Sequence, residues 1–164
     1  MTTAKKRIIG IDFGFKRIGV SYSDETKMIA MPLTVVTAEK KSAATLAKVV
    51  AILRKHAEEY GYNIEAIVIG KPLLMSGKSG FMADEASHFL ELLRKSIQTE
   101  YIFWDERLSS MQAERALMES TLTRKERSKK VDTVAAVIIL QSYLDHLRLQ
   151  KEKEERDRLF NSES

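Results

Sequence analysis

The sequence of 164 residues contains no cysteine. This absence excludes disulfide bonds and thiolate metal sites, but carboxylate metal sites remain open. It is compatible with a reducing compartment, and we expect a cytoplasmic protein. No apolar run approaches the ~18 residues that a membrane helix needs, and Met1–Lys6 is short and polar. We therefore expect neither a signal peptide nor a membrane partner.

Charge of one sign is in only slight excess. The net charge of +4 and the pI near 9.2 weakly favour a polyanionic partner. The segment Arg124–Lys130 holds five bases and one acid, so it accounts for the whole excess. The length and the 44% hydrophobic content are typical of one soluble globular domain.

Hydrophobic periodicity predicts the element order β-β-β-α-β-α-β-α-α. Alternating or β-branched apolar residues predict five strands, at Arg7–Phe13, Arg17–Ser23, Met28–Val36, Ile64–Gly70 and Glu100–Glu106. Helical spacing predicts helices from about Leu46 to Tyr60, around Ala86–Ile97, from Ser109 to about Glu119, and from about Ser128 to Leu149.

Turn-forming residues punctuate these elements. We expect Gly14 to supply a positive φ in the hairpin link Gly14–Lys16, and Gly61 to end the first helix. Pro32 indicates that the third strand lies at an edge of the sheet or carries a bulge.

An antiparallel start followed by βα crossovers predicts an α/β fold. The expected architecture is a mixed five-stranded sheet, its first three strands antiparallel, flanked by helices on both faces. Residues 1–149 form the expected single domain. Residues 150–164 alternate in charge without apolar spacing, so we expect a charged, mobile tail that frays from the last helix.

Acidic residues stand at three positions that the fold alone does not explain. Asp12 ends the first strand, Asp105 and Glu106 end the fifth, and Asp132 lies near the start of the last, otherwise apolar helix. The carboxyl ends of such strands meet at one edge of the sheet, and a buried last helix that crosses this edge brings Asp132 there. Converging carboxylates repel one another unless cations neutralise them.

Oxygen ligands without cysteine or a histidine cluster suit Mg²⁺ or Mn²⁺. Two such ions about 3.5–4 Å apart can support phosphodiester hydrolysis. Other interpretations stay open: Asp12 as a turn former, Asp132 as a helix N-cap, and one of Asp105 and Glu106 paired with Arg107 or facing solvent. We favour Glu106 over Asp105 as the ligand.

Basic residues and a glycine-containing loop accompany these acids. The loop Lys71–Gly80 either brings its backbone N–H groups and Lys78 to a phosphate or is an ordinary βα loop. Candidate nucleic-acid contacts are Lys16, Arg17, Lys78, Arg107, Lys129 and Lys130. The three histidines, His56, His88 and His146, lack ligand spacing, and we expect them to be structural or exposed.

Four stretches together resemble a known family. "GIDFGFKRIGVSYSD", "GKPLLMSGKSG", "DERLSS" and "KKVDTVAAVIILQSYLD" are similar, in order, to the four signature blocks of the YqgF/RuvX family. The resemblance runs roughly from Arg7 to Leu147. It implies an RNase H-like fold related to RuvC Holliday-junction resolvases, with catalytic metal ligands at Asp12, Glu106 (or Asp105) and Asp132.

The resemblance also implies an activity. It predicts a metal-dependent endonuclease that matures the 5′ end of pre-16S ribosomal RNA, with branched DNA as the alternative substrate and a non-catalytic RNA-binding assembly factor as the alternative role. The expected protein is a monomer or homodimer. Lys71 and Ser76 depart from the family pattern, which puts the substrate contacts of their loop in doubt. An actin-like ATPase shares "GIDFG" but needs two such domains, so we reject it.

Overall fold

The computed structural model describes residues 5–14, 16–70, 80–104 and 124–162, with only the main chain described for residues 80–86 and 124–133. Its strands are β1 (Lys5–Phe13), β2 (Arg17–Ser23), β3 (Ala30–Thr37), β4 (Tyr62–Gly70) and β5 (Glu100–Trp104). Its helices are α1 (Ser42–Tyr60), α3 (Gly80–Ser96) and α5 (Arg124–Ser162). The helix expected at Ser109–Glu119 lies outside the described residues.

The strands form one mixed sheet in the order β3-β2-β1-β4-β5. β1 pairs antiparallel with β2 and β2 antiparallel with β3, whereas β4 lies parallel to both β1 and β5. The predicted sheet is therefore confirmed. β3 lies at an edge, as Pro32 indicated, and the register shifts there, because Val20 faces Thr34 while Ser21 faces Pro32. Leu33 is the extra residue of this bulge.

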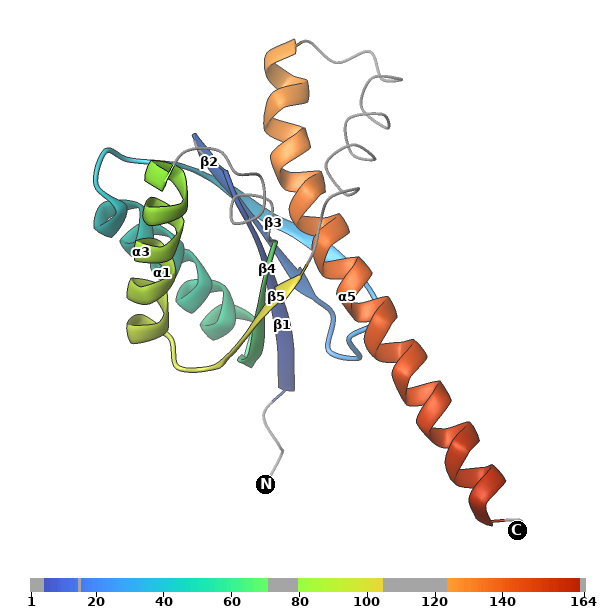
Figure 1. Ribbon diagram of the computed structural model, residues 1–164. Coiled ribbons are helices and arrows are strands. Elements are labelled where there is room, and N and C mark those ends of the chain that lie inside the picture. The colour runs from blue at the N-terminus through green and yellow to red at the C-terminus, as the bar shows by residue number, and fades with distance from the viewer. Residues whose placement is uncertain (1–4, 15, 71–79, 105–123, 163–164) are drawn as a thin grey trace.

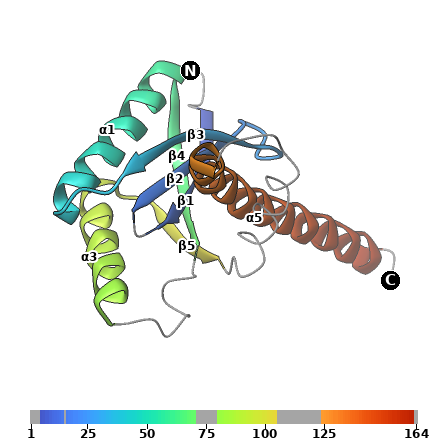
Figure 2. The ribbon, with the colours of Figure 1, turned by 90° about the horizontal axis from the view of Figure 1, so that it is seen from above.

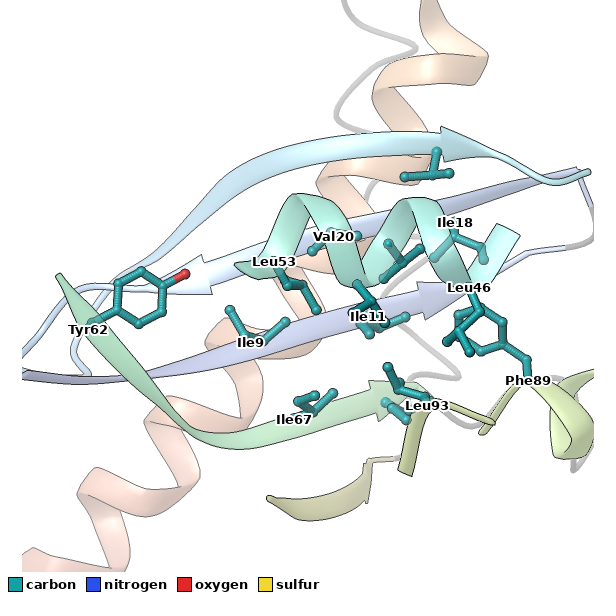
Figure 3. Packing of buried hydrophobic residues seen from close by; sticks show 14 residues of the cluster. Ile9, Ile11, Ile18, Val20, Leu46, Leu53, Tyr62, Ile67, Phe89 and Leu93 are labelled. Carbon is teal, nitrogen blue, oxygen red and sulfur yellow. The ribbon is translucent and has the colours of Figure 1, made fainter. Parts of the chain in front are cut away.

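Helices cover both faces of the sheet, α1 and α3 on one side and α5 on the other (Figures 1 and 2). Alternation along β1 divides its residues between two cores: Ile9 and Ile11 pack toward α1 and α3, and Ile8 packs toward α5. Figure 3 shows the first core, where Phe89 and Leu93 of α3 approach the sheet beside the α1 side chains. None of the described helices is long and apolar enough to cross a membrane.

Helix α5 approaches β1 very closely at Gly10. A Cβ atom at Gly10 would stand 2.8 Å from Leu140 Cβ and 3.2 Å from the Ala136 carbonyl oxygen. The buried Ser21 hydroxyl, on β2, donates a hydrogen bond to that same carbonyl oxygen at 2.7 Å. Because Gly10 has no side chain, α5 lies close enough to the sheet for the Ser21 hydroxyl of β2 to form a hydrogen bond with the main chain of the helix.

The limits of α5 correct two sequence-based expectations. The helix begins at Arg124 rather than Ser128, and it continues to Ser162 rather than fraying at Leu149. The added residues contain neither proline nor glycine, and opposite charges recur at i, i+4 spacing, as in Glu152 and Arg156. All the residues from Arg148 to Ser162 are exposed. Helix formation there depends on local propensity rather than on packing.

Two further expectations were wrong in detail. Gly14 does not adopt a positive φ; its role is spatial, because a Cβ there would lie 2.5 Å from the Arg17 carbonyl oxygen, which accepts a hydrogen bond from Gly14 N–H at 3.0 Å. β3 begins at Ala30 instead of Met28, because Asp24 Oδ1 accepts hydrogen bonds from the Met28 and Ile29 amides and holds them in a turn. Gly61 does end α1, with φ 65°.

His56, on α1, is a structural histidine, as expected. Its Nδ1 lies 2.7 Å from the Tyr62 hydroxyl, and its ring packs at centroid distances of 4.4 Å from Tyr22 and 4.5 Å from Tyr60. Burial, and then the positive charge of Arg7, lower the pKa of His56 below its ordinary 6.5.

We expect the substitution Gly10→Ala to lower the free energy of unfolding by about 1–3 kcal/mol, because the new methyl group must displace α5 or Ser21. Urea denaturation measures this loss. Gly61→Asn is the matched control: nothing lies within 4 Å of the Cβ position at Gly61, and asparagine tolerates its left-handed conformation. An equal loss in both variants would contradict the close-approach explanation.

Stability is expected to decrease in acid through His56. The pKa of His56 in the folded state lies below 6.5, so the unfolded chain binds the proton more readily. The contribution of neutral His56 to the free energy of unfolding is therefore complete above pH 6.5 and is lost as the pH falls through the lower pKa of the folded state. Urea denaturation at about pH 7.5 and about pH 5.5 measures the decrease. His56→Gln should reduce the decrease, whereas His88→Gln, at an exposed position, should preserve it.

Candidate active site

The carboxyl ends of the parallel strands β1, β4 and β5 meet at one edge of the sheet. Asp12 lies at this edge, near the end of β1, and its side chain is half-buried. It is directly opposite Gly19 of β2 in the antiparallel pair. The tertiary fold therefore holds a carboxylate where the sequence predicted one.

Helix α5 runs toward the same edge. Gln141 accepts a hydrogen bond from the Ala30 amide at 2.8 Å near the opposite edge, whereas Ala136 lies against Gly10 in the middle of β1. The N-terminal part of α5 therefore points to the end of β1 that carries Asp12 (Figure 1). Residue 132 lies one helical turn before Ala136, on the same side of the helix and nearer this edge.

Asp132 is not an N-cap, because α5 starts eight residues earlier, at Arg124. This interpretation, left open by the sequence, is wrong. Asp132 lies inside α5, one turn before the residue that contacts Gly10, so helix capping does not explain why an acid stands there.

The neighbours of Asp12 are the residues that lie on the same face of the sheet. Side chains alternate along a strand, so Asp12 lies on the same face as Gly10, the face that α5 covers. On β2, Ser21 contacts α5, which places Gly19 and Arg17 on this face too. Arg17 is half-buried and stands at the start of β2, beside the end of β1. A guanidinium and a carboxylate thus share one corner of the sheet.

β5 delivers its C-terminal end to the same edge. Ile11 is level with Ile69, and Gly70 is level with Trp104, so the end of β5 lies at the height of Asp12, two strands away. Trp104 lies on the α5 face: its Nε1 donates to Ser142 Oγ at 3.0 Å. The predicted ligands Asp105 and Glu106, together with Arg107, come next in the chain and lie outside the described residues.

The remaining predicted contacts are only partly described. Lys16 is exposed at the β1–β2 connection. Lys129 and Lys130 lie in the first turns of α5, where only the main chain is described. Lys78 and the rest of residues 71–79 lie outside the described residues. Among the described side chains, which include only Asp12 of the three predicted ligands, no group of three or more His, Asp or Glu residues could hold a metal.

Sequence analysis missed two exposed bases in the segment before α1. The Ala38 amide donates to the Lys16 carbonyl oxygen at 2.8 Å, which brings the segment before α1 beside the β1–β2 connection. Lys40 and Lys41 are exposed in this segment, and α1 follows with no acidic residue in its first turn. Helix N-termini favour acids, so two lysines there are the signal that could have been noticed.

The acid in that segment does not cancel these charges, because Glu39 pairs with Lys48. Lys16, at the β1–β2 connection, and Lys40 and Lys41, in the segment before α1, are therefore three exposed bases on segments that a backbone hydrogen bond joins; we call them the basic strip. The positive end of the α1 dipole adds to the potential of Lys40 and Lys41.

Comparison with known proteins identifies the fold and family. A family model described as "RuvX: Holliday junction resolvase" matches residues 6–146. The chain belongs to the RuvX family. As a RuvX protein it is a member of a nuclease family, a class of hydrolases that act on ester bonds, as the sequence predicted. The match ends at residue 146, whereas α5 continues to Ser162.

Two relatives of this RuvX chain illustrate the match. A protein of Protochlamydia amoebophila (strain UWE25) with the name "Putative pre-16S rRNA nuclease" is 56% identical over 139 residues, 85% of this chain and 93% of the relative. A protein of the same name from Bacillus cytotoxicus is 40% identical over 140 residues, 85% of this chain and 98% of the relative.

A solved structure supports the fold assignment. The structure "T. thermophilus RuvC in complex with Holliday junction substrate" has a TM-score of 0.55 at 12% identity, covering 87% of the RuvX chain and 96% of the RuvC chain. The predicted RNase H-like fold is therefore confirmed.

Proposed function

We propose that this RuvX protein is a metal-dependent endonuclease that hydrolyses phosphodiester bonds in structured RNA, and that it matures the 5′ end of pre-16S ribosomal RNA. The observation that carries the proposal is the convergence at one sheet edge: Asp12 at the end of β1, and α5 directed so that residue 132 approaches the same edge. Relatives at 56% and 40% identity that bear the name of a pre-16S rRNA nuclease support the substrate.

We propose Glu106, rather than Asp105, as the third ligand. Trp104 lies on the face that α5 covers, which is also the face of Asp12. Continued alternation beyond β5 would carry residue 106 to this face and residue 105 to the other one. This alternation supports the preference for Glu106 over Asp105 that the sequence already indicated.

The donor set fits a hard divalent ion, because Asp12, Glu106 and Asp132 offer only carboxylate oxygens and the chain has no cysteine. Bound Mg²⁺ or Mn²⁺ would activate the attacking water and stabilise the leaving oxygen. The protein's own contribution would be to place the three carboxylates, with Asp12 on β1, Asp132 on α5 and Glu106 in the segment that follows β5. Arg17, beside Asp12, would orient the phosphate that is cleaved.

The basic strip would bind the phosphates that flank the cleaved bond. Lys16 lies at the β1–β2 connection next to Arg17, and Lys40 and Lys41 lie in the segment before α1. Each phosphate neutralised there would release counterions. We propose Lys78, Arg107, Lys129 and Lys130 as further contacts. We also propose a cytoplasmic location, a monomeric or homodimeric state, and a nuclease domain ending near Leu149.

Branched DNA is the second candidate substrate, favoured by the description of the family as a Holliday junction resolvase. Symmetric cleavage of a junction requires two active sites, so this activity would need a dimer. Comparing cleavage of a four-way junction with cleavage of a pre-16S RNA fragment separates the two substrates.

Asp12→Asn and Glu106→Gln should each reduce cleavage at least about 100-fold in Mg²⁺ or Mn²⁺, because a lost ligand removes several kcal/mol of transition-state stabilisation. Asp105→Asn is the matched control and should retain most activity. Gel assays of pre-16S RNA cleavage measure the rates, and thermal denaturation checks the fold. Full activity of Asp12→Asn would overturn the nuclease proposal; RNA binding without cleavage in the wild type would favour the assembly factor.

Lys40→Ala combined with Lys41→Ala should weaken RNA binding several-fold and reduce the slope of log K against log salt by about 1–2, the value for two lost phosphate contacts. Fluorescence anisotropy over a salt series measures both quantities. Lys151→Ala combined with Lys153→Ala removes the same charge from the exposed part of α5 and should leave the slope unchanged. Identical slopes in the two double variants would mean that only net charge matters.

A further inference from the structure

A groove of ≈ 530 Å³ runs between α3 and β5, on the sheet face opposite α5. Leu90 and Phe103 form its apolar part, and Arg94, Lys95 and Gln98 supply exposed polar groups. This groove is separate from the carboxylate corner, which lies on the other face. No step of the proposed hydrolysis uses it.

Arg94 is held in place by two aromatic rings. Its guanidinium carbon lies 5.7 Å from the ring centroid of Tyr101 and 5.8 Å from that of Phe103. The Tyr101 hydroxyl donates to the Leu93 carbonyl oxygen of α3 at 3.1 Å and to the Ile97 carbonyl oxygen, just after the end of α3, at 2.6 Å. Burial raises the pKa of Tyr101 to about 12, so it remains a donor. The platform beneath Arg94 is therefore anchored to α3 itself.

The charge of Arg94 has no carboxylate partner among the described residues. The acid Glu91, which also lines the groove, has its Oε1 3.8 Å from the Nζ of Lys95, one turn along α3, so the two opposite charges lie side by side. The guanidinium thus presents a planar cationic surface and several N–H donors to the groove. A planar cation supported on aromatic rings is suited to stacking with an unpaired nucleobase and to binding its phosphate.

β5 connects this groove to the proposed cleavage site. Phe103 lies in the groove, Trp104 lies on the α5 face, and the chain then enters the segment that contains Glu106. A strand that follows β5 around the edge of the sheet would pass from the groove to the carboxylates. Only an unpaired strand can offer its base faces in this way, because a duplex keeps them stacked.

We infer that the groove between α3 and β5 binds an unpaired nucleotide of the RNA that flanks the cleaved bond, with its base stacked on Arg94. The inference rests on the proposed nuclease function. It specifies which part of the substrate binds to the sheet face opposite α5. The amide of Gln98 is placed to form hydrogen bonds with the base edge, and Arg94 N–H groups with the phosphate. An extended peptide is the competing occupant; if it is the true one, Arg94→Ala would leave RNA binding unchanged in the measurement below.

The test compares two RNA hairpins, one with a single-stranded flank and one with a blunt end, by fluorescence anisotropy in the Asp12→Asn background. Arg94→Ala should weaken binding of the flanked RNA about 5- to 100-fold, the loss expected for one stacked base, and change the blunt RNA less than about twofold. Arg94→Lys should not restore binding, because lysine keeps the positive charge but lacks the planar guanidinium group.

Arg54→Ala is the matched control, since Arg54 is an exposed arginine on α1 whose Nη2 donates to the Ser96 carbonyl oxygen. It should leave the preference for the flanked RNA intact. Equal losses on both RNAs, full rescue by Arg94→Lys, or no loss at all would overturn the inference, and the last result would leave a peptide as the occupant. Cleavage by Asp12→Asn would instead refute the nuclease function, which these binding measurements do not use.

Discussion

The contact between α5 and β1 at Gly10 is the constraint on which the rest of the structure depends. With no side chain on β1 at this point, the helix lies against the strand, and Ser21 holds the Ala136 carbonyl oxygen directly. This contact sets both the distance and the direction of α5. Because the helix is rigid, residue 132 is carried to the edge where Asp12 lies. The contact that stabilises the fold therefore also positions residue 132 for the proposed hydrolysis.

Alternation along the strands gives the two faces of the sheet different roles. Ile9 and Ile11 face α1 and α3 in a largely apolar core, whereas Gly10 and Asp12 face α5. The apolar face contributes stability, and the other face can therefore accommodate a carboxylate near its end. β5 joins the two environments, because Phe103 contributes to the groove below Arg94 while Trp104 contacts α5.

Strong periodicity made most of the fold predictable. The strands, the antiparallel pairing of the first three, the end of α1 at Gly61 and the edge or bulge at Pro32 all followed from local patterns. Prediction was weaker where a pattern was ambiguous. The residues after Leu149 have no apolar spacing, which resembles a solvated tail, yet their alternating charges also suit a helix. Gly14 was correctly noticed and wrongly explained, since its role depends on the Arg17 carbonyl oxygen.

The sequence by itself determined the class of the fold, the family and the types of residue available for chemistry, because periodicity and motif spacing are local properties of the chain. Only the tertiary structure decided which of these residues share a face. The segment that carries Lys40 and Lys41 is joined to Lys16 by the hydrogen bond from the Ala38 amide, and the guanidinium of Arg94 lies over rings from a later strand. Such contacts depend on strand register and helix direction, which are set by packing between elements distant in the sequence.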